Sequence, residues 1–135
     1  MIDAVRAWME HFDESQSSAP SSPRECRVLV TGGRDFDGED WLRRVLDGIK
    51  PTFIVQGAAS GADLLARDYA IKRKIPVASE PADWKRHGKA AGPIRNRYML
   101  KRWLPDIVLA FPGGRGTCDM VQAAHDAGVP VVTAI

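Results

Sequence analysis

The sequence predicts an α/β fold, a Rossmann-like doubly wound parallel sheet of about five strands with helices on both faces. Short apolar segments rich in β-branched residues alternate with segments whose apolar residues recur at helical spacing. Repeated strand–helix units of this kind favour a parallel sheet covered by helices. Glycine-rich turns follow three of the predicted strands, as expected at the ligand-binding edge of such a sheet.

Each element of this fold is indicated by a local pattern. Strands are expected at residues 27–31, 52–56, 75–79, 106–111 and 130–134. Helices are expected at residues 38–49, 61–73, 93–103 and 117–127. The first helix has the clearest apolar stripe, which includes Trp41, Leu42 and Val45. Gly48 and Gly128 mark helix ends, since a proline follows shortly after each of them.

The chain is expected to form one folded domain, residues 26–135, preceded by an accessory segment, residues 1–25. Its 135 residues suit a single domain whose core needs neither disulfide nor metal. Residues 1–12 carry apolar side chains at helical spacing, and residues 15–23 are rich in serine and proline, as a flexible linker is. We expect the leading helix to pack on a partner or on its own domain.

Charge is distributed unevenly along the chain, although the net charge is only +2. Residues 72–102 hold ten Lys or Arg against two acidic residues, which leaves nine basic and fifteen acidic residues elsewhere. A basic segment can serve nucleic acid, a phosphorylated small molecule or only solubility. Because much of this one accompanies the glycine-rich turns, we favour a phosphate-bearing ligand, with nucleic acid as the less favoured partner.

Several partners and cofactors are not expected. No apolar run is long enough to span a membrane. Cys26 and Cys118 have neither metal-ligand nor C-x-x-C spacing and are expected to be reduced thiols of a cytoplasmic protein. No other cluster has metal-ligand spacing, so no metal and no other cofactor are expected. A homo-oligomer, a dimer or larger, is expected.

Three glycine-rich turns are the most informative features of the sequence. Residues 112–117, Pro-Gly-Gly-Arg-Gly-Thr, join a strand to a helix, and this combination suits phosphate because glycine lets the backbone approach a helix N-terminus with its positive dipole end. Residues 32–35 and 57–63 are similar turns after two other strands. Since the carboxyl ends of parallel strands share one edge, we expect one composite pocket. Taken singly, each turn is also compatible with a tight connection that binds nothing.

Residues 81–97 are expected to form a long loop beside these turns, and long loops in compact domains commonly bind ligands. Trp84 offers a ring for stacking, Arg95 offers forked donors for phosphate, and Asn96 can bind a sugar or base. Asp35 and Asp63 serve either as ligand contacts or as helix N-caps. The expected ligand-binding residues are Gly32, Gly33, Arg34, Asp35, Gly57, Gly61, Asp63, Trp84, Arg95, Asn96, Pro112, Gly113, Gly114, Gly116 and Thr117.

The order of these motifs resembles the YpsA-related branch of the SLOG superfamily, which also contains the lonely-guy nucleotide hydrolases and the Smf/DprA proteins. The motifs are those at residues 32–36, 57–63, 81–97 and 110–117, and the resemblance covers about residues 26–135. It implies a Rossmann-like sheet and a pocket for nucleotides or nucleotide-derived ligands.

The chain departs from the lonely-guy pattern at one position. Those enzymes release the base from a nucleoside monophosphate, and their pattern pairs an arginine, matched here by Arg95, with a glutamate, replaced here by Met120. Asp119 is expected about 100° away around the helix and is not a simple replacement. Glycosidic cleavage needs a carboxylate. The catalytic candidates are therefore Arg95 with Asp35, Asp63 or Asp83.

We expect a protein that binds or senses a nucleotide or a nucleotide-derived, ADP-ribose-like phosphorylated ligand through its glycine-rich loops. The alternative is a lonely-guy-like hydrolase that cleaves an N-glycosidic bond, and a second alternative is single-stranded DNA binding as in Smf/DprA. The missing glutamate favours binding with slow or no hydrolysis. A Met120→Glu variant is expected to restore some cleavage.

Overall fold

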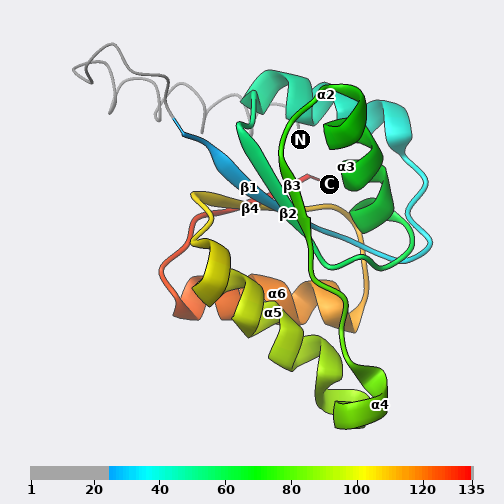
Figure 1. Cartoon of the computed structure of the whole chain (residues 1–135), viewed down its shortest axis with the longest axis vertical. Coiled ribbons are helices and arrows are strands. Elements are labelled where there is room, and N and C mark those ends of the chain that lie inside the picture. Colours follow the sequence, from blue (N-terminus) through cyan, green and yellow to red (C-terminus); the bar gives the residue numbers. More distant parts are fainter. Residues whose placement is uncertain (1–24, 135) are drawn as a thin grey trace.

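The computed structural model describes residues 25–134, in which five strands form one parallel sheet (Figure 1). The strands are β1 (Arg27–Thr31), β2 (Phe53–Gln56), β3 (Val77–Ser79), β4 (Ile107–Ala110) and β5 (Val131–Thr133), in the spatial order β3-β2-β1-β4-β5. The chain moves outward from β1 to β3 and then returns to pair β4 with the other side of β1. This reversal creates a switch point between β1 and β4, where open parallel sheets bind ligands.

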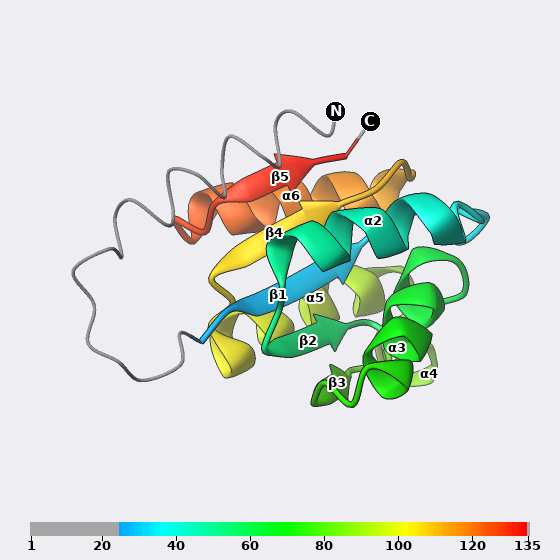
Figure 2. The ribbon, with the colours of Figure 1, turned by 90° about the horizontal axis from the view of Figure 1, so that it is seen from above.

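Two helices cover each face of the sheet in this part of the chain (Figures 1 and 2). The helices α2 (Glu39–Ile49) and α3 (Ala62–Lys72) lie on one face, and α5 (Ala91–Trp103) and α6 (Arg115–Asp126) lie on the other. Alternate residues of β1 point to opposite faces of the sheet. Val28 and Val30 pack toward α2 and α3, whereas Leu29 packs toward α5 and α6. The structure therefore confirms the predicted doubly wound α/β fold.

The expected long loop over residues 81–97 is wrong, because most of this segment is helical. It contains α4 (Trp84–His87) and a 3₁₀-helix, η1 (Gly88–Ala90), which leads directly into α5. Asp83 caps α4, where its side chain accepts a hydrogen bond of 3.1 Å from the backbone N–H of Arg86. Pro93 falls in the first turn of α5, where a missing N–H costs little.

The accessory segment, residues 1–25, lies outside the described residues except for Glu25. Its role therefore stays a prediction. Among residues 25–134, none of the helices combines the length and the apolar character that a membrane crossing would need.

Backbone hydrogen bonds connect the three glycine-rich turns at the carboxyl edge of the sheet. The N–H of Gly33 donates to the carbonyl oxygen of Pro112 at 2.8 Å, and the carbonyl oxygen of Gly33 accepts from the N–H of Ala62 at 3.3 Å. Gly61 lies against this junction with φ +77°, and a Cβ atom at Gly61 would collide with the Gly33 carbonyl oxygen. Only glycine suits this position, since both its backbone conformation and its surroundings exclude a side chain.

A Gly61→Ala substitution is expected to destabilise the fold by about 2 kcal/mol or more, because it adds a steric clash to backbone strain. Gly128→Ala is the matched control. Gly128 has a similar φ of +73°, but a Cβ there would meet no atom within 4 Å. It should cost only about 1–2 kcal/mol. Urea unfolding of both variants measures the difference, and equal losses would show that the junction imposes no packing constraint.

Candidate functional site

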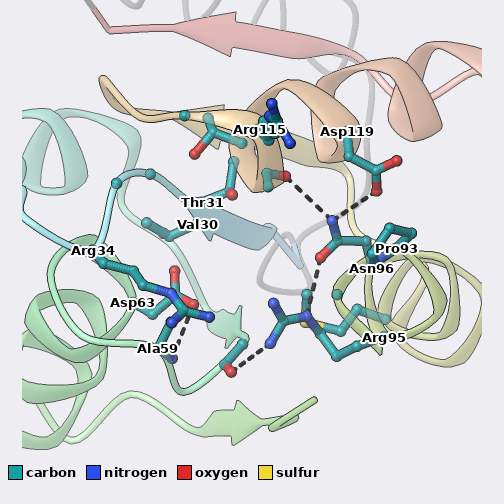
Figure 3. A pocket seen from close by; sticks show the side chains of 18 of the residues that line it. Val30, Thr31, Arg34, Ala59, Asp63, Pro93, Arg95, Asn96, Arg115 and Asp119 are labelled. Carbon is teal, nitrogen blue, oxygen red and sulfur yellow. Dashed lines mark hydrogen bonds between the residues drawn. The ribbon is translucent and has the colours of Figure 1, made fainter. Parts of the chain in front are cut away.

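A pocket of about 520 Å³ lies at the carboxyl edge of the sheet, around the switch point between β1 and β4 (Figure 3). This volume is in the range of small-molecule sites. The turns after β1, β2 and β4 form part of its wall, and α4, η1 and the first half of α5 close the opposite side. The predicted loops therefore meet in one pocket.

Eleven of the fifteen expected ligand-binding residues line this pocket. They are Gly32, Gly33, Arg34, Gly57, Asp63, Trp84, Arg95, Asn96, Gly114, Gly116 and Thr117.

The other four expected residues lie outside the lining. Asp35 is exposed on the turn after β1. Gly61 and Pro112 contact Gly33 behind the pocket wall, and a Cβ at Gly113 would collide with the hydroxyl group of Thr117. Gly61, Pro112 and Gly113 therefore shape the turns and do not face a ligand. Of the catalytic candidates, Asp83 also lies outside the lining and caps α4.

The N-terminus of α6 presents free backbone donors to the pocket. The first N–H of this region with a carbonyl partner is that of Cys118, which donates to Gly114 at 3.0 Å. The preceding N–H groups, those of Arg115, Gly116 and Thr117, belong to lining residues and have no backbone acceptor in the described contacts. A Cβ at Gly114 or Gly116 would meet nothing within 4 Å, so the space beside them is open. Free donors, a helix dipole and open space are the features that favour an anion at a helix N-terminus.

Arg95 lies on the second turn of α5 and reaches across the pocket toward β2 (Figure 3). Its Nη1 atom donates to the carbonyl oxygens of Gly57 at 2.6 Å and Glu80 at 3.2 Å. A Cβ at Gly57 would collide with this guanidinium group, which explains the glycine. Burial lowers the pKa of Arg95, whereas the nearby carboxylate of Asp63 acts in the opposite direction.

Asn96 fixes the orientation of Arg95 through a chain of hydrogen bonds (Figure 3). Its Oδ1 atom accepts from Nε of Arg95 at 3.0 Å, and its Nδ2 atom donates to Asp119 at 2.9 Å and to the Gly116 carbonyl oxygen at 3.3 Å. Asp119 also accepts from Arg97 at 3.0 Å. The buried amide of Asn96 thus connects α5 to α6 and is occupied by protein partners. Asn96 therefore positions Arg95, although a contact between Asn96 and a sugar or base was expected.

Asp63 is a buried carboxyl group on the wall opposite α5. It is 6% exposed and lies in the first turn of α3, where its Oδ2 atom accepts from the N–H of Ala59 at 3.2 Å. It does not cap α3, whose N-cap is Gly61. Burial raises the pKa of Asp63 to about 6, although Arg95 and Arg34 and the N–H groups of Ala59 and Gly57 oppose this rise.

Trp84 and Arg34 form the rim of the pocket. The guanidinium carbon of Arg34 lies 5.3 Å from the ring centroid of Trp84, which is within cation–π distance. Trp84 is 47% exposed, so part of its ring remains free for a further contact.

Met120 occupies the position of the family's glutamate, but Asp119 and not Met120 lines the pocket in the structure. Met120 is fully buried in the core beneath α5 and α6, and Asp119 lines the pocket. The buried residues Met120, Ala123 and Ala124 have the spacing of one helical face, and Asp119 lies at the edge of this face. The structure does not favour the Met120→Glu expectation, because a carboxylate at this position would enter the core and not the pocket.

Lys89 and Arg115 also line the pocket and belong to the segments 81–97 and 112–117, but they were not among the expected ligand-binding residues. Their charges add to those of Arg34 and Arg95. Among the described residues, no group of three or more His, Cys, Asp or Glu side chains is arranged to hold a metal ion.

An Asp63→Asn substitution is expected to stabilise the fold at pH 7.5 by on the order of 2 kcal/mol. In the unfolded chain an aspartate loses its proton near pH 4, whereas Asp63 in the folded protein loses it near pH 6. The native protein therefore loses stability as the pH rises between these values, and the penalty is complete above about pH 6. Urea unfolding at pH 7.5 and pH 4.5 tests this, and the gain should be small at pH 4.5. No gain at pH 7.5 would contradict it.

Comparison with known proteins agrees with this architecture. The family model described as "YspA, cpYpsA-related SLOG family" matches residues 26–87, a range that contains the turns after β1 and β2. The chain is also 36% identical over 121 residues to the Gene 61 protein of Mycobacterium phage D29, an alignment that covers 78% of this chain and 94% of the phage protein. The chain belongs to the cpYpsA-related SLOG family.

Proposed function

We propose that the pocket binds a nucleotide or a nucleotide-derived phosphorylated ligand, with a phosphate group over the N-terminus of α6. The observation that carries this proposal is the set of free N–H groups at Arg115, Gly116 and Thr117, beside open space and within the same pocket as Arg95. Phosphate binds such helix ends because the donors converge and the helix dipole favours negative charge.

The charge of the lining also favours an anion. Four basic residues line the pocket, Arg34, Lys89, Arg95 and Arg115, against two carboxyl groups. One of these carboxylates, that of Asp119, is already paired with Arg97. A phosphate would therefore enter a pocket with an excess of positive charge.

The remaining wall suits the nucleoside part of such a ligand. Trp84 offers a half-exposed ring at the rim, and aromatic faces stack well on nucleobases. Membership of the SLOG family supports a nucleotide-related role.

The two alternative functions have less support. For base release, the position of the lonely-guy glutamate is occupied by Met120, which lies in the core. The nearest carboxylate on α6, that of Asp119, accepts hydrogen bonds from Asn96 and Arg97. For single-stranded DNA, three of the ten basic residues of segment 72–102 already have acidic partners, since Lys72, Arg73 and Arg97 pair with Glu39, Asp47 and Asp119. Binding without turnover is the function that this pocket supports best.

Arg95→Ala is expected to weaken binding of AMP by about 1.5–3 kcal/mol, the worth of a hydrogen bond to a charged group. Titration calorimetry of the full chain with AMP and with ADP-ribose measures this loss. Arg44→Ala is the matched control, because Arg44 is an exposed arginine of α2 outside the pocket. Equal affinity in both variants would contradict the proposed role of Arg95. The same incubated samples should contain little or no free adenine.

Gly116→Ala is expected to separate binding from folding. The new methyl group has no protein neighbour within 4 Å, and alanine favours a helix, so the unfolding midpoint should be unchanged or higher. The methyl group narrows the space beside the first-turn N–H groups, so AMP affinity should fall at least several-fold. A variant with native AMP affinity would argue against phosphate at this end of the pocket.

A further inference from the structure

Asp63 is a buried polar group of the pocket, and the proposed phosphate contact does not involve it. Its Oδ2 atom accepts from the N–H of Ala59, and the N–H of Gly57 also lies close enough to lower its pKa, but in the described contacts no side chain donates to either oxygen. Neither Arg34 nor Arg95 lies within ion-pair distance of it among the described ion pairs, although both lie near enough to affect its pKa. A carboxylate can accept about four hydrogen bonds, so the Asp63 side chain at the pocket wall has acceptor capacity left for a donor of the ligand.

The chemistry of Asp63 limits which part of a ligand can meet it. An ionised carboxylate only accepts hydrogen bonds, and it repels a phosphate, which is an anion that also accepts. The phosphate site and Asp63 are also separated across the sheet. They follow β4 and β2, which lie on either side of β1, and two strand spacings amount to about 10 Å. Asp63 therefore faces a part of the ligand that carries donors and lies away from the phosphate.

The depth of Asp63 distinguishes a sugar from a base. Trp84, the stacking surface for a base, is half exposed at the rim, whereas Asp63 is 6% exposed on the deeper wall beside Gly57. In a nucleotide the sugar connects the phosphate to the base. A base at the rim and a phosphate at α6 leave the sugar, with its hydroxyl groups, to the wall that holds Asp63.

We propose that Asp63 accepts hydrogen bonds from the vicinal hydroxyl groups of a ribose, so that the ligand of this pocket is a ribonucleotide and not a deoxyribonucleotide. This inference rests on the proposed function, because it takes the phosphate to bind at α6. A site built to bind a hydroxyl group rejects an analogue that lacks it, because the buried acceptor is then left unpaired.

The ionisation state of Asp63 gives this recognition a pH dependence. The charged groups that face the carboxyl group are Arg34, from the turn after β1, and Arg95, from α5. The ionised form accepts both hydroxyl groups more strongly than the protonated form. Because the pKa of Asp63 is about 6 in the free protein, the preference for ribose should be complete above that pH and should shrink as the pH falls below it.

The experiment compares AMP with 2′-deoxy-AMP and 3′-deoxy-AMP by titration calorimetry on the full chain at pH 7.5 and pH 5.0. At pH 7.5, AMP should bind about ten-fold or more tightly than either deoxy analogue. At pH 5.0 this ratio should fall toward one. All three ligands carry the same phosphate, so its own titration cancels from the ratio at each pH.

A pair of variants of α3 completes the test. Asp63→Asn should reduce the preference for AMP over its deoxy analogues at pH 7.5 to about two-fold or less. The substitution should also remove the pH dependence of this preference. Asp68→Asn is the matched control, because Asp68 is exposed on the same helix outside the pocket, and it should keep the native ratio.

The outcomes separate this inference from the proposed function. Equal binding of AMP and its deoxy analogues by the native protein would overturn the role of Asp63 and leave phosphate binding intact. A ribose preference that survives in Asp63→Asn would assign the recognition to another residue. If neither the three monophosphates nor ADP-ribose binds, the proposed function fails and the inference fails with it.

Discussion

Gly33 holds together the turns on which the pocket depends. Its N–H group donates to Pro112 in the turn after β4, and its carbonyl oxygen accepts from Ala62 at the start of α3. These two hydrogen bonds connect the turns after β1, β2 and β4 at one edge of the sheet. The free N–H groups of α6 and the carboxyl group of Asp63 are both attached to this edge. Their relative positions are thus set by backbone hydrogen bonds and by glycines too closely packed to carry side chains.

The pocket carries polar groups that a purely structural core would avoid. Asp63 is buried with a raised pKa, and Arg95 is largely removed from water with its guanidinium held by Gly57, Glu80 and Asn96. Burial of both groups costs stability, which the apolar layers on the two faces of the sheet offset. Local departures of this kind from the rules of stable packing are characteristic of binding sites.

The predictable part of this fold is the part that hydrophobic periodicity determines. The strands and the four long helices were predicted within a few residues, because short continuous apolar runs rich in β-branched residues differ clearly from segments whose apolar residues recur at a period of 3.6. The meeting of the glycine-rich turns was also predictable, since parallel strands share one edge. Residues 81–97 were not, because α4 depends on a capping contact of Asp83 and lacks an apolar stripe.

The finer errors at the site have equally local causes. Family spacing suggested that Met120 would face the ligand, but the phase of the buried residues on α6 turns Asp119 to the pocket. Asp35, Gly61, Pro112 and Gly113 were named from their motifs, and a motif does not say which residue of a turn faces inward. The role of Asn96 depends on hydrogen bonds to Arg95 on its own helix and to Asp119 on α6, and no pattern along the chain encodes the second of these.

The proposed phosphate position over the N-terminus of α6 can be tested by amide NMR spectroscopy. AMP added to ¹⁵N-labelled protein should shift the backbone amide signals of Arg115, Gly116 and Thr117 more than those of any residue on α2. Inorganic phosphate at higher concentration should shift the same three signals in the same direction. Large shifts elsewhere, with these three signals unmoved, would show that the phosphate does not bind at this helix end.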